Sequence, residues 1–436
     1  MSWRASPSRG AREARSAATP ETGAAPSPLN RLLGPGLVSG AADDDPSGIA
    51  TYSQAGAALG YQAAWMLPLC YPLMAASQEI SARIGRAAGV GLVGAITRHT
   101  PRPLGLVIAV GVAVANIANL GADLAAMADA VHLLIGGPQL VYAPAFAVLC
   151  AGLLLRLRYR RYVRAVKWAA LALIVYLIVP ACLAIPWAAV LRASLLPSLP
   201  ATGAAVGILV AVLGTSISPY LLVWQSSLEA DRARLLPAPA AWAAEGRRIR
   251  FDSWAGMAVA ALVGYAVVLT CAATLHPAGI VSIVSSADAA GALRPVAGDL
   301  AGLAFALGII GTGLLAVPML AGSAAFALAE ARGWPAGLAH APSEAPGFYA
   351  AIVIATAIGA ALVALGVNPI RALLLSAVLN GVVSVPVLVV MMRIASRKAV
   401  MGALALTPGL AALGWLTTLV MAAGGAALVV SLFEYA

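Results

Sequence analysis

The sequence predicts an all-α membrane protein with eleven membrane-spanning segments. Of its 436 residues, 61% are apolar and only 10% are charged, whereas soluble domains have about 45–50% apolar and about 25% charged residues. Apolar runs of about 20 residues recur along the chain, which is the length that crosses about 30 Å of hydrocarbon. These observations exclude a water-soluble enzyme, a disordered protein and a fibrous protein.

The first 30 residues are rich in Ser, Ala, Pro and Arg and contain no apolar core. They therefore predict a disordered cytosolic tail rather than a secretory signal. The eleven apolar segments that follow cover residues 32–58, 61–82, 104–130, 138–155, 166–190, 203–228, 253–275, 299–330, 347–366, 370–395 and 406–432. We assign the first five to a region 31–196, the next five to 197–398 and the last to 399–436.

The basic residues are distributed very unequally between the loops. With the N-terminus in the cytosol, 24 Lys and Arg residues fall on the cytosolic side and 3 on the opposite side. This agrees with the positive-inside rule and predicts a cytosolic N-terminus in a bacterial-type inner membrane. The net charge of +10 therefore reflects membrane topology, and no nucleic-acid partner is expected.

Segment 32–58 contains the run Asp43-Asp44-Asp45-Pro46-Ser47-Gly48 near its middle. Carboxylates inside a membrane span are costly, so they predict a functional site that faces protein or water. Pro46 has no N–H and Gly48 tolerates an open backbone, so the helix should break here. The carbonyl groups freed by the break can then act as ligands beside the carboxylates.

Segment 203–228 has a second interruption, Gly214-Thr215-Ser216-Ile217-Ser218-Pro219-Tyr220. The two interruptions lie in the first segment of each half of five, and an odd number of segments orients the halves oppositely. Paired breaks of this kind indicate a midplane substrate site in an inverted-repeat transporter. Proline and glycine can also simply kink membrane helices, but the adjacent carboxylates favour a site.

Several motifs in these segments resemble one protein family. Gly34-Pro35-Gly36, Asp45-Pro46-Ser47-Gly48 and Gln54-Ala55-Gly56 are similar to the first helix of the natural resistance-associated macrophage protein (Nramp) family of divalent-metal transporters, and Ser81-Ala82-Arg83-Ile84-Gly85 resembles the end of its second helix. The resemblance covers residues 30–435. It implies the leucine-transporter-type fold, with two inverted five-helix repeats plus an eleventh transmembrane helix.

The resemblance also implies a metal site at the two breaks. Asp45 keeps the family's acidic ligand, whereas Gly48 replaces its asparagine ligand and Ser218 replaces its methionine ligand. Tyr220 stands where the family has a histidine, and Thr215 takes the position of the backbone-carbonyl ligand. We expect Asp45 to be the primary ligand and Asp44 a ligand or a neighbouring polar group, with Asp43 in the vestibule.

The resemblance places further polar residues around this site. Asn116 and Asn119 occupy the third-helix positions at which the family carries Asp and Glu for proton transfer, and Asp123 follows on the same helical face. On the tenth helix, Ala377 stands at the position of the family's glutamine, with Asn380 three residues later. We expect Asn116, Asn119, Asp123, Tyr220 and Asn380 to line the cavity or to support the ligands.

These departures are similar to the magnesium-transporting branch of the Nramp family and favour magnesium as the transported ion, while manganese, which can also use an all-oxygen site, stays open. A thioether ligand selects softer metals such as manganese and iron, and its loss leaves oxygen donors, which suit magnesium. Magnesium retains several waters when bound, so a wide, wet cavity is expected. Asparagine cannot relay protons, so transport without proton coupling is expected.

Other functions remain open from the sequence. A proton-coupled manganese or iron carrier is the main alternative; a carrier for an amine or amino acid and a non-transporting metal sensor are others. No HExxH, CxxC or phosphate-loop motif is present, so neither an enzyme activity nor a cofactor is expected. The predicted partners are divalent cations and the lipid bilayer, with no obligatory protein partner.

Overall fold

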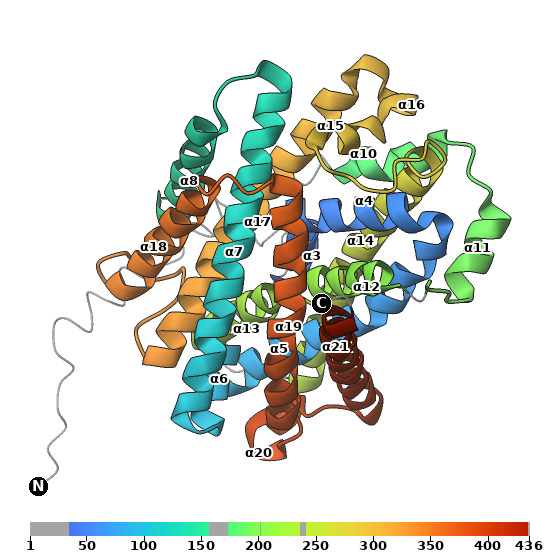
Figure 1. Ribbon diagram of the computed structural model, residues 1–436. Coiled ribbons are helices and arrows are strands. Elements are labelled where there is room, and N and C mark those ends of the chain that lie inside the picture. Colours follow the sequence, from blue (N-terminus) through green and yellow to red (C-terminus); the bar gives the residue numbers. More distant parts are fainter. Residues whose placement is uncertain (1–34, 157–172, 201, 236–240, 435–436) are drawn as a thin grey trace, which may run out of the picture. The chain divides into compact units, whose positions relative to one another are not determined.

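The computed structural model describes residues 35–156, 173–200, 202–235 and 241–434, and within these ranges it contains helices and no strands (Figure 1). The all-α prediction is therefore confirmed for the described residues, while the predicted tail 1–30 lies outside them. The longer helices are α3 (Pro35–Asp43), α4 (Pro46–Leu59), α5 (Met66–Ala88), α6 (Leu92–His99), α7 (Arg102–Ile135), α8 (Gln139–Arg156), α12 (Gly203–Ser216), α13 (Pro219–Leu235), α14 (Trp242–Thr274), α17 (Ala301–Arg332), α18 (Pro346–Val363), α19 (Pro369–Ala395) and α21 (Pro408–Glu434).

Within the described ranges, eight helices are long and apolar enough to cross a membrane, with α12 and α13 counted together. The predicted spans that are not among these eight helices differ from them in length or in charge. The break divides the first span into α3 and α4, which are too short individually. Helix α5 carries Glu79, Arg83 and Arg86 in its second half, which lowers its hydropathy.

Both predicted interruptions are confirmed. Helix α3 ends at Asp43 and α4 begins at Pro46, with Asp45 as the residue that caps α4. Helix α12 ends at Ser216 and α13 begins at Pro219. Proline is well tolerated in the first turn of a helix, because the N–H groups of that turn have no partner within the helix.

The predicted continuous span 166–190 is wrong in its second half. After α10 (Leu173–Ile178) the chain forms a 3₁₀ turn, η3 (Val179–Cys182), and then a separate helix, α11 (Trp187–Leu195). Pro180 and Pro186 cannot donate the backbone hydrogen bonds that would continue one helix. Residues 166–172 lie outside the described part. Helix α14 also differs from its prediction, because it begins at Trp242 rather than at 253.

Small residues let the broken helices approach their neighbours closely. A Cβ atom added to Gly40 of α3 would lie 2.1 Å from the carbonyl oxygen of Gly256 in α14, and one added to Gly214 of α12 would lie 2.1 Å from the carbonyl oxygen of Ala377 in α19. Small residues at such crossings are typical of membrane helix packing, which depends on close van der Waals contact. These contacts fix α3 against α14 and α12 against α19.

We expect Gly40→Ala to destabilise the purified protein by about 1–3 kcal/mol, because the new methyl group would overlap rigid backbone. Gly425→Ala in α21 is the matched control, since a Cβ atom there meets nothing within 4 Å. Unfolding of both variants in detergent would measure the difference. A Gly40→Ala variant as stable as Gly425→Ala would contradict the close α3–α14 contact.

Candidate metal site

The two helix breaks each free a specific carbonyl group. In a continuous α-helix, the N–H of each residue bonds to the carbonyl four positions earlier. Pro46 therefore deprives the Ala42 carbonyl of its helical donor, and Pro219 does the same to the Thr215 carbonyl. The hydroxyl group of Tyr220 donates to the Ala42 oxygen at 2.6 Å, so a side chain from the second break replaces the missing donor of the first.

Asp45 is held by donors from two elements, α4 and α7. One carboxylate oxygen accepts from the backbone N–H of Gly48 at 2.7 Å, and the other accepts from the amide of Asn119 at 2.9 Å. The hydroxyl of Ser376 in α19 donates to the Asn119 side-chain oxygen at 2.7 Å. Asn119 is thereby oriented with its donor toward Asp45, so α19 acts on this carboxylate only through Asn119.

The two breaks also touch each other directly. The Ser47 and Thr215 hydroxyl oxygens are 3.4 Å apart. A Cβ atom at Gly48 would lie 3.0 Å from the Asp43 carbonyl oxygen and 3.5 Å from the Thr215 hydroxyl oxygen. The absence of a side chain at Gly48 therefore allows the start of α4 to lie beside the end of α12. The structure thus brings the predicted residues Asp45, Gly48 and Thr215 together.

Four carboxylates are buried around the first break. Asp43 and Asp45 are 1% exposed, while Asp44 and Asp123 are 0% exposed. The oxygens of Asp43, Asp44 and Asp123 accept no hydrogen bond within the described residues, and no described Lys, Arg or His forms an ion pair with any of the four. Asp43 was expected in an open vestibule and is instead buried.

The remaining predicted residues lie at varying places around the breaks. Ser218 is fully buried, and its hydroxyl has no partner among the described residues; the same holds for the side-chain oxygen of Asn380, which is 1% exposed. Asn116 faces α17 rather than Asp45: in the amide orientation that satisfies its neighbours, its oxygen accepts from Ser323 at 3.0 Å. Ala377 contributes close backbone packing against Gly214.

The expected wide, wet cavity is absent from the described conformation. Gly48 is buried, Thr215 is 3% exposed and Ser218 is 0% exposed, so these residues have almost no contact with solvent. Helices α3, α4, α12 and α19 pack closely around the breaks because glycines, which have no side chain, lie where these helices meet their neighbours. In the described part of the chain, no group of three or more His, Cys, Asp or Glu residues is arranged to hold a metal. Any ion site here must therefore combine carboxylate with neutral oxygen atoms.

Sequence reasoning missed the serine residues that complete this region. Ser376 orients Asn119, and Ser384 donates to the carbonyl oxygen of Ile217 at 2.6 Å. Together with Asn380 they recur every four residues on α19, which places them on one helical face. This period was the available signal. Ser323 of α17 likewise donates to the Tyr220 carbonyl at 2.9 Å.

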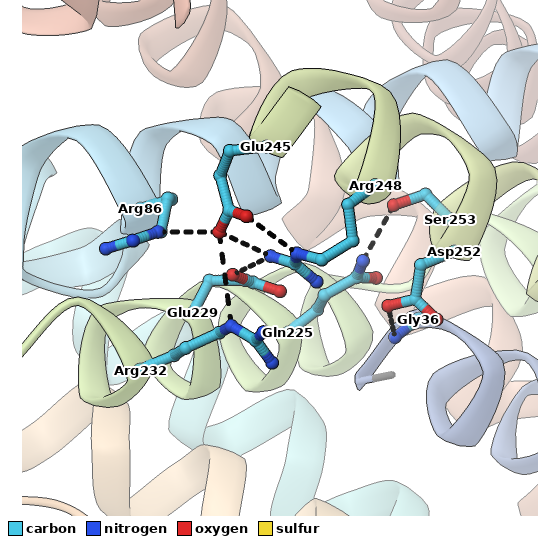
Figure 2. A network of polar contacts seen from close by, with 9 residues as sticks. All are labelled: Gly36, Arg86, Gln225, Glu229, Arg232, Glu245, Arg248, Asp252 and Ser253. Atoms are coloured by element: carbon cyan, nitrogen blue, oxygen red, sulfur yellow. Dashed lines mark hydrogen bonds and ion pairs between the residues drawn. The ribbon is translucent and has the colours of Figure 1, made fainter. Parts of the chain in front are cut away.

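A charged network joins α5, α13 and α14 (Figure 2). Arg248 contacts Glu229 at 2.6 Å and Glu245 at 3.1 Å, and Arg86 contacts Glu245 at 2.8 Å. Glu229 and Arg232 lie three residues apart on α13, but the ion-pair partner of Glu229 is Arg248 of α14. The separate Glu79–Arg83 pair, at 2.6 Å, forms as the spacing of four predicts.

Two further polar contacts lie near this charged network, and one of them involves the start of α3. The backbone N–H of Gly36 donates to the Asp252 carboxylate at 2.8 Å, and the amide of Gln225 donates to the hydroxyl of Ser253 at 2.8 Å (Figure 2). A carboxylate at a helix N-terminus is favourable, because it satisfies an unpaired N–H and opposes the positive end of the helix dipole. Asp252 therefore anchors the first half-helix to α14.

Comparison with known proteins identifies similar chains. The family model "Natural resistance-associated macrophage protein-like" (Nramp) matches residues 36–431. A protein of Acidiphilium cryptum named divalent metal cation transporter MntH is 31% identical over 388 residues, covering 86% of this chain and 84% of the relative. A protein of the same name from Deinococcus radiodurans is 27% identical over 423 residues, covering 94% and 93%.

Solved structures show the same fold at lower identity. A manganese transporter of Eremococcus coleocola superposes with a TM-score of 0.73 at 17% identity, covering 94% of this chain and 88% of that chain. Mhp1, a nucleobase-cation-symport-1 family transporter, superposes with a TM-score of 0.58 at 13% identity, covering 92% and 91%. The fold is therefore the leucine-transporter type, with two inverted five-helix repeats and an eleventh helix.

We expect Tyr220→Phe to destabilise the protein by about 1–3 kcal/mol, because the buried Ala42 carbonyl would lose its donor. Tyr61→Phe is the matched control, since the Tyr61 hydroxyl makes no hydrogen bond within the described residues; its effect should stay within about 0.5 kcal/mol. Unfolding of the purified variants in detergent measures both. Equal stability of the two variants would show that the Tyr220 hydroxyl does not support the first break.

Proposed function

The chain belongs to the Nramp family, and from this membership we propose that it is a secondary carrier for divalent metal cations that works by alternating access. It is an integral membrane protein and a membrane transporter rather than an enzyme. The named relatives are described as divalent metal cation transporters, and the superposed Eremococcus coleocola protein as a manganese transporter.

The observation that carries the proposal is the group of buried carboxylates at the first helix break. Asp43, Asp44, Asp45 and Asp123 form no ion pair with a basic side chain in the described ranges. An uncompensated buried negative charge is costly, and a divalent cation would compensate two such charges at once. The C-terminal ends of α3 and α12 add the partial negative charge of their last carbonyls.

The donors around the breaks suggest a role for each predicted ligand. Asp45 is the primary anionic ligand, because donors from α4 and α7 position its carboxylate at the break. Asp44 is the second carboxylate, and its oxygens have no partner among the described residues. Thr215 supplies the carbonyl freed by Pro219, Ser218 supplies a small polar lining, and Gly48 leaves room for the ion beside Asp45.

We propose magnesium as the principal substrate. The predicted ligand positions carry carboxylate, hydroxyl and carbonyl oxygens, and the family's thioether position is Ser218. Magnesium prefers oxygen ligands and keeps several of its waters. Because the described site is closed to water, entry of a hydrated ion requires α3 and α12 to separate. Such a movement would break the hydrogen bond between the Gly36 N–H at the start of α3 and the Asp252 carboxylate.

We further propose that transport proceeds without proton coupling. Asn116 and Asn119 are amides and cannot carry a proton as carboxylates do. The membrane potential is sufficient, since a divalent cation gains about 4.6 kcal/mol per 100 mV, which supports accumulation of about three orders of magnitude. Asp123 favours the second candidate, a proton-coupled manganese or iron carrier, because this buried carboxylate interacts with Asp45.

We expect Asp45→Asn to abolish divalent-cation uptake into proteoliposomes while the protein still inserts. The substitution removes the negative charge that would attract and hold the cation. Asp299→Asn is the matched control, because Asp299 is exposed and lies far along the chain in η4 (Gly298–Leu300). Uptake should be measured under an imposed inside-negative potential. Normal uptake by correctly inserted Asp45→Asn would reject the proposed site.

Internal pH and metal entry, recorded together, separate the two carriers. Magnesium entry without acidification supports the proposal, whereas manganese entry with acidification and exclusion of magnesium supports the proton-coupled candidate. We also expect Ser218→Met to shift the preference toward manganese by about tenfold, because a thioether is a softer ligand. An unchanged magnesium-to-manganese ratio in a variant that still transports would place selectivity at other residues.

A further inference from the structure

A second polar region lies away from the helix breaks. It is a cavity of about 690 Å³ between the ends of several helices. Four arginines from four different helices line it, which is an unusual concentration in a chain with so few charged residues. They are Arg98 of α6, Arg102 at the start of α7, Arg234 of α13 and Arg332 at the end of α17.

The positive charge in this cavity exceeds the negative charge. Arg234 contacts Asp231 at 3.3 Å. Arg98 and Arg102 are exposed and form no ion pair with a described acidic residue. Arg332 lies over the ring of Trp334 at 5.4 Å.

The cavity's one lining carboxylate is already engaged. Glu330 is the acidic residue that lines it, and its two oxygens accept from the Ser227 hydroxyl at 2.7 Å and from the Gly94 backbone N–H at 2.8 Å. Glu330 is therefore turned toward α13 and α6, where it holds these elements together. Arg98 and Arg102 form no ion pair with a described acidic residue and remain available to an anion that enters from outside.

The cavity lies at the level of the lipid headgroups. Three of the helices that could cross a membrane begin or end at its arginines, as the spans Arg102–Ile135, Gly203–Arg234 and Arg294–Arg332 show. Trp334, which is 42% exposed, is a residue type enriched at the membrane–water interface. This end of the protein is also the side that the charge distribution predicts to be cytosolic.

An apolar surface continues from the cavity along α7. Leu104 and Leu106 are each 44% exposed and Val107 is 68% exposed, all within two turns of Arg102. Exposed apolar side chains at this depth face acyl chains in a bilayer. A molecule with a phosphate group in the cavity and a hydrocarbon chain beside α7 would satisfy both surfaces.

We propose that this cavity binds the phosphate group of an anionic phospholipid. Arginine guanidinium groups donate paired hydrogen bonds to phosphate oxygens, and basic pockets between membrane helices on the cytoplasmic side accommodate anionic headgroups. Free phosphate shares this chemistry but offers nothing to the apolar face of α7. The proposal does not depend on the metal site, since none of its residues lies at the helix breaks.

The experiment is native mass spectrometry of the purified full-length protein titrated with phosphatidylglycerol or phosphatidylcholine. We expect tighter binding of phosphatidylglycerol, and we expect the double substitution Arg98→Gln/Arg102→Gln to weaken it by about tenfold or more. Arg247→Gln is the matched control, because Arg247 is an exposed arginine of α14 that does not line the cavity. It should bind lipid as the unaltered protein does.

Three results would overturn the proposal. The double variant could bind phosphatidylglycerol as tightly as the Arg247→Gln control, or the two lipids could bind equally. In a separate titration, inorganic phosphate could bind in a manner that depends on Arg98 and Arg102, while phosphatidylglycerol binds no more tightly than phosphatidylcholine. That result would assign the cavity to a soluble anion. Circular dichroism and metal uptake of the double variant confirm that it is folded, because neither arginine belongs to the proposed ion site.

Discussion

The structure depends on the need to satisfy backbone polar groups that have no access to water. Pro46 and Pro219 each remove one N–H donor from a buried helix, and a carbonyl without a donor is costly in such surroundings. The Tyr220 hydroxyl meets this need at Ala42, and the Ser384 hydroxyl supports the Ile217 carbonyl. The polar side chains of the site therefore serve first to satisfy the carbonyl groups at the two breaks, and these hydrogen bonds bring the breaks close together.

The carboxylates buried at the first break are subject to the same constraint. Asp45 is satisfied by the Gly48 N–H and the Asn119 amide, so it can remain buried without a basic partner. Asp43, Asp44 and Asp123 lack such donors among the described residues. Carboxylates with so few donors are the reason for proposing a cation site at this break.

Charge plays a different role at the ends of the helices. The arginines of the network around Glu245 contact acidic partners and hold α5, α13 and α14 together (Figure 2). Arg98 and Arg102, which line the cavity between the ends of α6, α7, α13 and α17, form no ion pair with a described carboxylate. One group of arginines pairs with carboxylates inside the helix bundle, and the other stays exposed at the cavity.

The sequence by itself determined the helical class, most of the spans and both breaks, because hydropathy and the missing N–H of proline act locally. The choice of Asp45 as a ligand stays a prediction. The pairing of residues distant in the chain was decided by the tertiary structure. Ser376 orients Asn119 toward Asp45. Glu229 forms its ion pair with Arg248 rather than with its near neighbour Arg232, because helix packing decides which side chains meet. Closure of the site against water, and the division of 166–190, likewise depend on packing that hydropathy does not encode.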